Sequence, residues 1–133
     1  MAYLEIVIAG IAAFALGFLW YSALFGKAWQ AETGITDEQA QSNMFMTHGL
    51  ALLMMMIIAF GINYVVSMHD IAEQTFIHGG FHGLMTGVIY GMPVMAIHYL
   101  YQKKSLKLFL IDVGYILLIF ALMGGVLGAL KLG

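Results

Sequence analysis

Polar positions are rare along this chain, and they divide it into four long apolar segments. These segments cover residues 3–24, 44–68, 76–101 and 106–130. An α-helix needs about twenty apolar residues to cross a bilayer, whereas the strands of a membrane barrel are about ten residues of alternating polarity. The pattern therefore predicts an all-α integral membrane protein, a four-transmembrane-helix bundle with short loops, as a single domain over residues 1–133.

The longest polar segment, residues 26–43, contains a signal for the start of a helix. Thr36 and Gln39 have the spacing of a capping box, in which each side chain accepts a hydrogen bond from the other residue's backbone N–H. Asp37 and Glu38 would then fall in the first turn, where the helix dipole favours negative charge. We expect a helix to begin near Thr36 and to continue without a break into the second span.

The third apolar segment carries a glycine at every fourth position, and these glycines are Gly79, Gly83, Gly87 and Gly91. Residues four apart share one face of a helix, and small residues at this spacing let membrane helices pack closely. We expect this strip to be a helix-packing surface. The neighbour could be the first span, with Ala9, Ala13 and Gly17, the fourth span, with Gly124 and Gly128, or the same strip on another subunit.

The third span also holds the only proline of the chain, Pro93. Proline has no backbone N–H to donate to the carbonyl four residues earlier, at Ile89. Membrane helices tolerate this loss when a neighbour supplies a new partner. We therefore expect the third span to bend near this position.

Composition points to a membrane protein as well, because 62% of the residues are hydrophobic and only 9% are charged. A soluble domain carries about 25% charged residues. The lipid bilayer is thus the expected partner, and the net charge of −2 gives no reason to expect nucleic acid. The chain has no cysteine, which excludes thiolate metal sites, disulfides and thiol catalysis.

The lysines predict the orientation in the membrane, because basic residues in short loops stay on the cytoplasmic side. The first and third loops share one side, and they carry Lys27, Lys103, Lys104 and Lys107. The other side has only Lys131. We therefore expect a multi-pass membrane protein with both termini outside, in the periplasm if the membrane is the bacterial inner (cell) membrane, and a dual-topology dimer is the alternative.

Two segments resemble the signature of a known family. They are GFLWYSALFGKAW at residues 17–29, followed by GIT with acidic residues after it, and IDVGY at residues 111–115. Together they resemble domain of unknown function 1761, a bacterial family of unknown function, and the resemblance covers nearly the whole chain. It implies a four-helix membrane protein and carries no activity and no catalytic residues. The matching positions are Gly17, Trp20, Tyr21, Ser22, Phe25, Gly26, Lys27 and Trp29.

Polar residues inside or near lipid are costly, so we treat them as candidate functional sites. His78 and His82 are four residues apart on one helix face, as two imidazoles must be to share a metal ion. Glu5 and Asp70 are expected at the same end of the bundle and could complete a divalent-metal site. The alternatives are that these residues only mark the headgroup boundary, or that they have a proton-linked role suited to histidine.

A strip of polar residues runs beside the glycines, and it consists of His78, His82, Thr86 and Tyr90. His98 and Asp112 are expected at similar depth near the other end, on antiparallel helices. These six residues are a candidate polar pathway, in which a buried carboxylate beside a histidine could relay protons or bind a cation. Alternatively, Asp112 hydrogen-bonds a serine, a tyrosine or Lys107 and only holds two helices in register.

A copper site is a weaker hypothesis, carried by the thioether and imidazole groups that suit Cu(I). The residues concerned are Met44, Met46, His48, Met68 and His69. They lie at opposite ends of the second span, so no single site would collect them, and packing is the better explanation for the methionines. No nucleophile elbow or phosphate loop is present, and we do not expect an enzyme.

Three functional hypotheses follow from these observations. The first is a homo-oligomeric transporter or channel for a small solute, an ion or a proton, since one four-helix bundle leaves little room for a pathway. The second is a non-transport membrane scaffold or accessory subunit that packs through glycine-striped helices. The third is divalent-metal binding at the outer histidines and carboxylates. No cofactor is required by the sequence.

Overall fold

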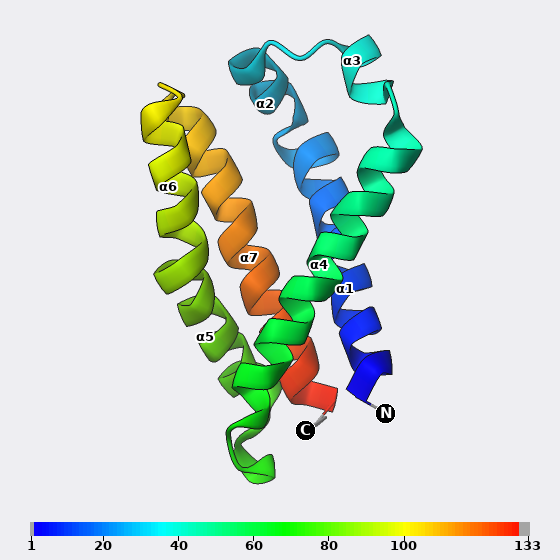
Figure 1. The fold of residues 1–133 in the computed structure, drawn as a ribbon, viewed down its shortest axis with the longest axis vertical. Coiled ribbons are helices and arrows are strands. Elements are labelled where there is room, and N and C mark those ends of the chain that lie inside the picture. The colour runs from blue at the N-terminus through cyan, green and yellow to red at the C-terminus, as the bar shows by residue number, and fades with distance from the viewer. Residues whose placement is uncertain (1, 131–133) are drawn as a thin grey trace.

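The computed structural model describes residues 2–130 and shows a bundle of long helices (Figure 1). Four helical segments are long and apolar enough to cross a membrane, and they are Tyr3–Leu24, Met44–Ser67, Phe76–Tyr101 and Leu106–Leu130. The part of the chain that the structure describes contains no strand. The expected all-α four-helix fold is therefore confirmed. The described ends of the chain lie at one end of the bundle, and α2 and α3 lie at the other (Figure 1).

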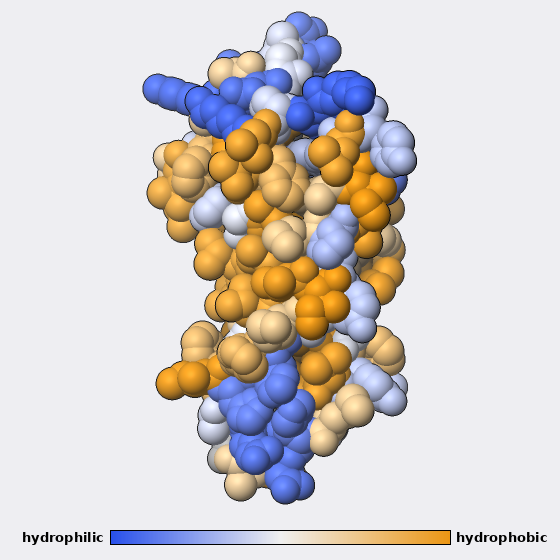
Figure 2. Space-filling model, turned by 90° about the vertical axis from the view of Figure 1, so that its left-hand side faces the viewer, coloured by the Kyte–Doolittle hydropathy of each residue, from blue (hydrophilic) through white to orange (hydrophobic). Residues whose placement is uncertain are grey.

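The elements follow one another with short connections. They are α1 (Ala2–Leu19), η1 (Trp20–Leu24), α2 (Gly26–Thr33), α3 (Asp37–Gln41), α4 (Met44–Ser67), η2 (Ile71–Glu73), α5 (Phe76–Thr86), η3 (Gly87–Gly91), α6 (Met92–Tyr101) and α7 (Leu106–Leu130). On the face shown in Figure 2, apolar side chains cover most of the middle, and hydrophilic ones gather at both ends. This distribution matches a bilayer core between two aqueous boundaries.

The capping box at Thr36 is present, but the expected continuous helix is wrong. Thr36 Oγ1 accepts a hydrogen bond from Gln39 N at 3.1 Å, and Gln39 Oε1 accepts one from Thr36 N at 3.0 Å. The helix that they start ends at Gln41, because Ser42 is extended and Asn43 takes a left-handed conformation with φ 50°. Asparagine tolerates that conformation better than most residues, so a polar pair can turn the chain before α4 begins.

Two of the spans are interrupted by π-helical turns. The first span changes to a π-turn at η1, where Phe25 N donates to Trp20 O at 2.8 Å. The third span does so at η3, immediately before Pro93 at the start of α6. A π-turn at this point accommodates a proline whose ring and missing N–H disturb regular helical bonding.

Helix α7 is the centre of the bundle. It has the largest buried share of the four spans, and α1, α4 and α5 all pack against it. The core consists mainly of α7 residues and of small or branched residues that face them from α1 and α4. Its members are Ile6, Ala9, Ala13, Ala59, Ile62, Val66, Tyr115, Ile119, Phe120, Met123 and Leu127.

The glycine strip of the third span, in α5 and η3, lies directly against α7. A Cβ atom at Gly79 would meet the carbonyl oxygen of Gly124, and one at Gly83 would meet that of Phe120. Gly128 lies equally close to the backbone at Thr75. Farther along, Gly87 faces side-chain rather than backbone atoms of α7. The two helices thus approach backbone to backbone near one end of the bundle, which only glycine permits.

Candidate functional site

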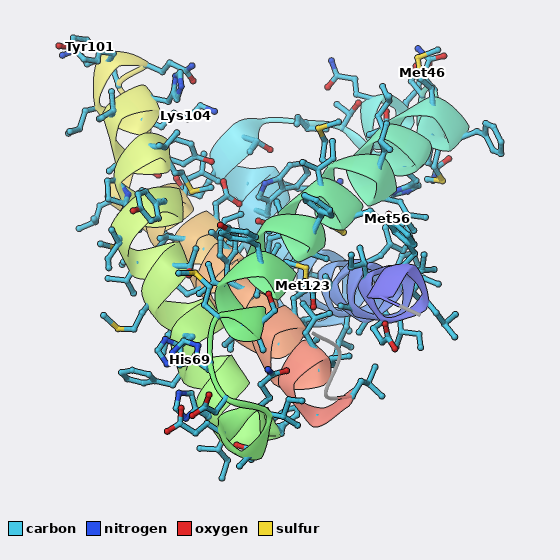
Figure 3. The ribbon with its side chains drawn as sticks, turned by 60° about the horizontal axis from the view of Figure 1, so that its bottom comes forward. Met46, Met56, His69, Tyr101, Lys104 and Met123 are labelled. Carbon is cyan, nitrogen blue, oxygen red and sulfur yellow. The ribbon has the colours of Figure 1, made fainter. Side chains whose placement is uncertain are left out.

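The connection between α4 and α5 folds back tightly at the end of the bundle that also holds the N-terminal part of α1. Helix α4 ends at Ser67, η2 forms one turn, and α5 begins after Thr75, whose hydroxyl oxygen accepts a hydrogen bond from His78 N at 3.1 Å. This N-cap fixes the start of α5. The reversal brings His69, just after α4, beside the first two turns of α5, and Figure 3 shows it at this junction.

Three histidines meet at this junction. One ligand atom from each of His69, His78 and His82 lies within 4.8 Å of the other two. The two Nε2 atoms of His78 and His82 are 2.7 Å apart, and the ring centroids of His69 and His82 are 4.0 Å apart. All three side chains are half-buried. The arrangement places several imidazole nitrogens around one point.

Backbone carbonyls and a buried amide support the cluster. His69 Nδ1 lies 3.2 Å from Val65 O, a contact that orients the ring and leaves Nε2 available as a ligand. The side chain of Gln74 is only 2% exposed, and its Nε2 donates to His69 O at 2.8 Å. Its Oε1 has no hydrogen-bond partner among the described residues. Gln74 and Glu73 line the same small cavity as the three imidazoles.

The carboxylates expected to join the histidines are not part of this group. Asp70 is exposed at the start of η2. Glu5 is buried on α1, and its Oε2 has no partner within the described chain. The sequence places His69 at this end and suggests it only as a copper ligand with nearby methionines, not as a partner of His78 and His82. Its position at a helix end followed by a short loop and a second helix was the available signal.

The polar strip beyond the histidines does not form a continuous cluster. Thr86 Oγ1 donates to the carbonyl oxygen of His82 on the preceding turn at 2.8 Å. Tyr90 is 68% exposed on the outer surface. Within one chain, therefore, the group near His78 and His82 ends about one turn beyond them.

Asp112 lies in a second polar group, at the other end of the bundle. Tyr21 OH donates to its Oδ1 at 2.5 Å, and Tyr99 OH donates to its Oδ2. The carboxylate is buried at 8% exposure. His98, which the sequence placed at the same depth, is exposed instead. Asp112 thus ties α7 to both η1 and α6 through tyrosines.

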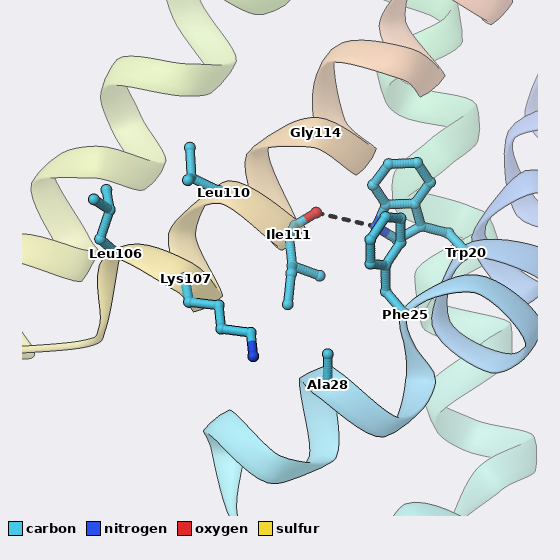
Figure 4. Close-up of a pocket in the computed structure, with 8 residues that line it drawn as sticks. All are labelled: Trp20, Phe25, Ala28, Leu106, Lys107, Leu110, Ile111 and Gly114. Atoms are coloured by element: carbon cyan, nitrogen blue, oxygen red, sulfur yellow. Dashed lines mark hydrogen bonds between the residues drawn. The ribbon is translucent and has the colours of Figure 1, made fainter.

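The two segments that carry the family resemblance contact each other. Trp20 Nε1 donates to Ile111 O at 3.0 Å, and the Trp20 ring lies against Gly114 (Figure 4). Tyr21 packs edge-on against Tyr115, with ring centroids 5.1 Å apart. Gly17 faces the same tyrosine. The π-turn at η1 therefore presents two consecutive aromatic residues to one segment of α7.

Comparison with known proteins gives one family and no close relative of known activity. No curated protein and no solved structure matches this chain. A family model described as a protein of unknown function, DUF1761, matches residues 4–128 and so includes both contacting segments. The chain is a multi-pass membrane protein that belongs to the DUF1761 family.

Proposed function

We propose that this membrane protein binds a divalent transition-metal ion through His69, His78 and His82. The observation that carries the proposal is the convergence of their three ligand atoms within 4.8 Å. Neutral imidazole is a favoured ligand for zinc, copper, iron and nickel. The residues come from two helices joined by a tight turn, so a bound ion would also fasten α4 to α5.

The dimensions of the cluster suit a metal ion. A tetrahedral zinc ion lies about 2.0–2.1 Å from each nitrogen, which places the nitrogens roughly 3.3 Å apart. Nε2 of His78 and Nε2 of His82, now 2.7 Å apart at hydrogen-bond distance, would separate to reach that spacing, and ligand atoms that lie up to 4.8 Å apart would approach one another. The gap between these residues has no space for a water-sized sphere in this structure, which favours a bare ion over an organic solute.

The fourth position could be filled from the same cavity. Glu73 and Gln74 both line it. Gln74 Oε1 is buried without a partner in the described structure, and it could accept a hydrogen bond from a metal-bound water once ion binding widens the gap. Three histidines and one open position also resemble the ligand set of exchangeable or catalytic zinc sites more than that of closed structural sites.

Transport of the bound ion is a second candidate function. It is favoured by two further buried oxygens at the same end of the bundle that lack partners among the described residues, Glu5 Oε2 and Asn63 Oδ1. A permeating cation could contact such oxygens. Because the polar strip ends near Thr86, this role would require a homo-oligomer to complete the pathway. A scaffold role would need neither the metal nor these oxygens.

Equilibrium titration of the purified protein with Co²⁺, followed by competition with Zn²⁺, tests metal binding. We expect one ion per chain and a visible absorption band of tetrahedral cobalt. His69→Ala, His78→Ala and His82→Ala should each weaken binding by at least about tenfold, the range in which even outer-shell partners act. The other two histidines supply matched controls, so His48→Ala and His98→Ala should bind as the parent does. Absence of binding by the parent, or equal loss in the controls, would contradict the proposal.

Uptake of Zn²⁺ into liposomes containing the protein separates the two candidates. Uptake that is lost in His82→Ala supports transport. Stoichiometric binding without uptake leaves a metal-binding membrane protein that does not transport the ion. An oligomer mass measured in the same preparation tests the expected homo-oligomer independently.

A further inference from the structure

A polar cleft opens at the lysine-rich end of the bundle, which is the end opposite the cluster of His69, His78 and His82. It has a volume of about 640 Å³, within the range of small-molecule sites. Asp112 lines it together with residues of α2, the end of α6 and the start of α7. The other lining residues are Trp29, Glu32, Thr33, Ile35, Tyr99, Lys103, Lys104, Ser105 and Leu108.

The carboxylate in this cleft has no cationic partner. Both oxygens of Asp112 accept hydrogen bonds from phenol groups, which is the arrangement expected around an ionised carboxylate. No lysine or histidine forms an ion pair with it in residues 2–130. A buried charge is costly unless it is paired. Asp112 lines the cleft, so a positively charged group could reach the carboxylate from there.

Aromatic rings surround the carboxylate. Tyr99 and Trp29 line the cleft, and Trp29 packs edge-on against Tyr21, with ring centroids 5.8 Å apart. Aromatic faces attract ammonium groups, and this attraction strengthens when water is excluded. A carboxylate among three aromatic side chains is therefore suited to an ammonium group.

The rim of the cleft carries the opposite charge. Lys104 Nζ lies 4.6 Å from the centroid of the Tyr99 ring, and Lys103 lines the same opening. Lys103 is the left-handed residue, with φ 58°, of the motif that ends α6, in which Lys104 N donates to Tyr99 O at 3.1 Å.

A second carboxylate at the rim is already engaged. Ser105 Oγ donates to Glu32 Oε2 at 2.6 Å and so joins α2 to the start of α7. Glu32 keeps its charge in this bond, but two lysines against one glutamate still leave a positive excess at the rim, above the negative charge of Asp112. A simple cation would be repelled at the opening, and a simple anion would be repelled at the buried end.

We propose that the cleft binds a small zwitterion, with its ammonium group at Asp112 and its anionic group at Lys103 and Lys104. A phosphoethanolamine group has this chemistry. It can come from the headgroup of a membrane lipid or from a water-soluble phosphodiester. This site is independent of the histidine cluster and of the proposed metal binding.

Calorimetric titration of the purified protein with glycerophosphoethanolamine tests the soluble source. Its two halves, ethanolamine and glycerol 3-phosphate, are the comparison ligands. We expect the zwitterion to bind at least tenfold more tightly than either half. For the lipid source, the protein is placed in nanodiscs of phosphatidylglycerol with or without phosphatidylethanolamine, and retained lipid is counted by mass spectrometry. Binding in either arm supports the proposal, and absence of binding in both overturns it.

Variants assign the two ends of the ligand. Asp112→Asn should abolish the preference for the zwitterion over glycerol 3-phosphate, and the double variant Lys103→Gln, Lys104→Gln should abolish the preference over ethanolamine. Lys107→Gln is the matched control, because Lys107 lines the neighbouring apolar pocket instead (Figure 4). If Asp112→Asn fails to fold, the lysine variants still decide. Unchanged preferences in them, or an equal loss in the control, would overturn the proposal.

Discussion

The hydroxyls of Tyr21 and Tyr99 each donate a hydrogen bond to a different oxygen of the buried Asp112 carboxylate. Tyr21→Phe removes one donor and leaves the ring. Hydrogen bonds between membrane helices contribute about 0.6 kcal/mol on average and up to about 1.7 kcal/mol. Because the acceptor is a buried charge, we expect a loss of stability near the upper value. Thermal denaturation in detergent measures it.

Tyr90→Phe is the control for this prediction, since Tyr90 is exposed on the outer surface and a lost hydroxyl there should leave the melting temperature unchanged. Equal melting of Tyr21→Phe and the parent would show that the carboxylate does not depend on this phenol.

Side-chain partners were harder to predict than residue classes. The sequence marks Asp112 as a costly polar residue within a span, and tyrosine was among its expected partners. It could not select Tyr21, which is 91 residues away and reaches α7 through the π-turn at η1. His69 shows the same limit, because its approach to His78 depends on the tight reversal at η2. Such contacts depend on how distant segments pack, and no local sequence pattern predicts them.

Glycines along the third span differ in what they face, and this leads to a graded prediction. At Gly83 an added Cβ meets backbone atoms of α7, which cannot move aside, whereas at Gly87 it meets side chains of Phe120 and Leu117. Overpacking costs about 1–3 kcal/mol, and occasionally more. We therefore expect Gly83→Ala to lower the melting temperature more than Gly87→Ala does.

Gly61 on α4 provides the control, because nothing lies within 4 Å of a Cβ placed there. Gly61→Ala should melt at or slightly above the parental temperature, given the better helix propensity of alanine. The contact is within one chain, so the mass in solution should not change in Gly83→Ala. A smaller oligomer with parental melting would instead place the strip between subunits.

Helix boundaries followed from the sequence wherever local signals decide them. The capping box at Thr36 and the four apolar runs are such signals. Two features do not follow from local patterns. The break before α4 depends on the left-handed conformation of Asn43, and asparagine is only slightly unfavourable inside a helix, so its identity does not predict a break. The two π-turns depend on contacts with other helices, which a local pattern does not contain.

At the scale of the molecule, packing and chemistry occupy different parts of the bundle. The backbone contact of α5 and α7 uses both glycine series within one chain. A homo-oligomer would therefore need another surface, such as the exposed apolar face of α4, where Gly49 and Gly61 have open space beside them. The histidine cluster and the Asp112 cleft lie at opposite ends, so their ligands would arrive from opposite sides of the membrane.

Which side each ligand comes from depends on the orientation of the bundle. Four of the five basic residues, Lys27, Lys103, Lys104 and Lys107, belong to the end with the Asp112 cleft. The positive-inside rule then predicts this end in the cytoplasm and the histidines outside. A reporter active only outside the cytoplasm, fused after Gly133, should be active, and the same reporter inserted in the 103–107 loop should be inactive. The reverse pattern would overturn the orientation, and activity at both positions would instead indicate dual topology.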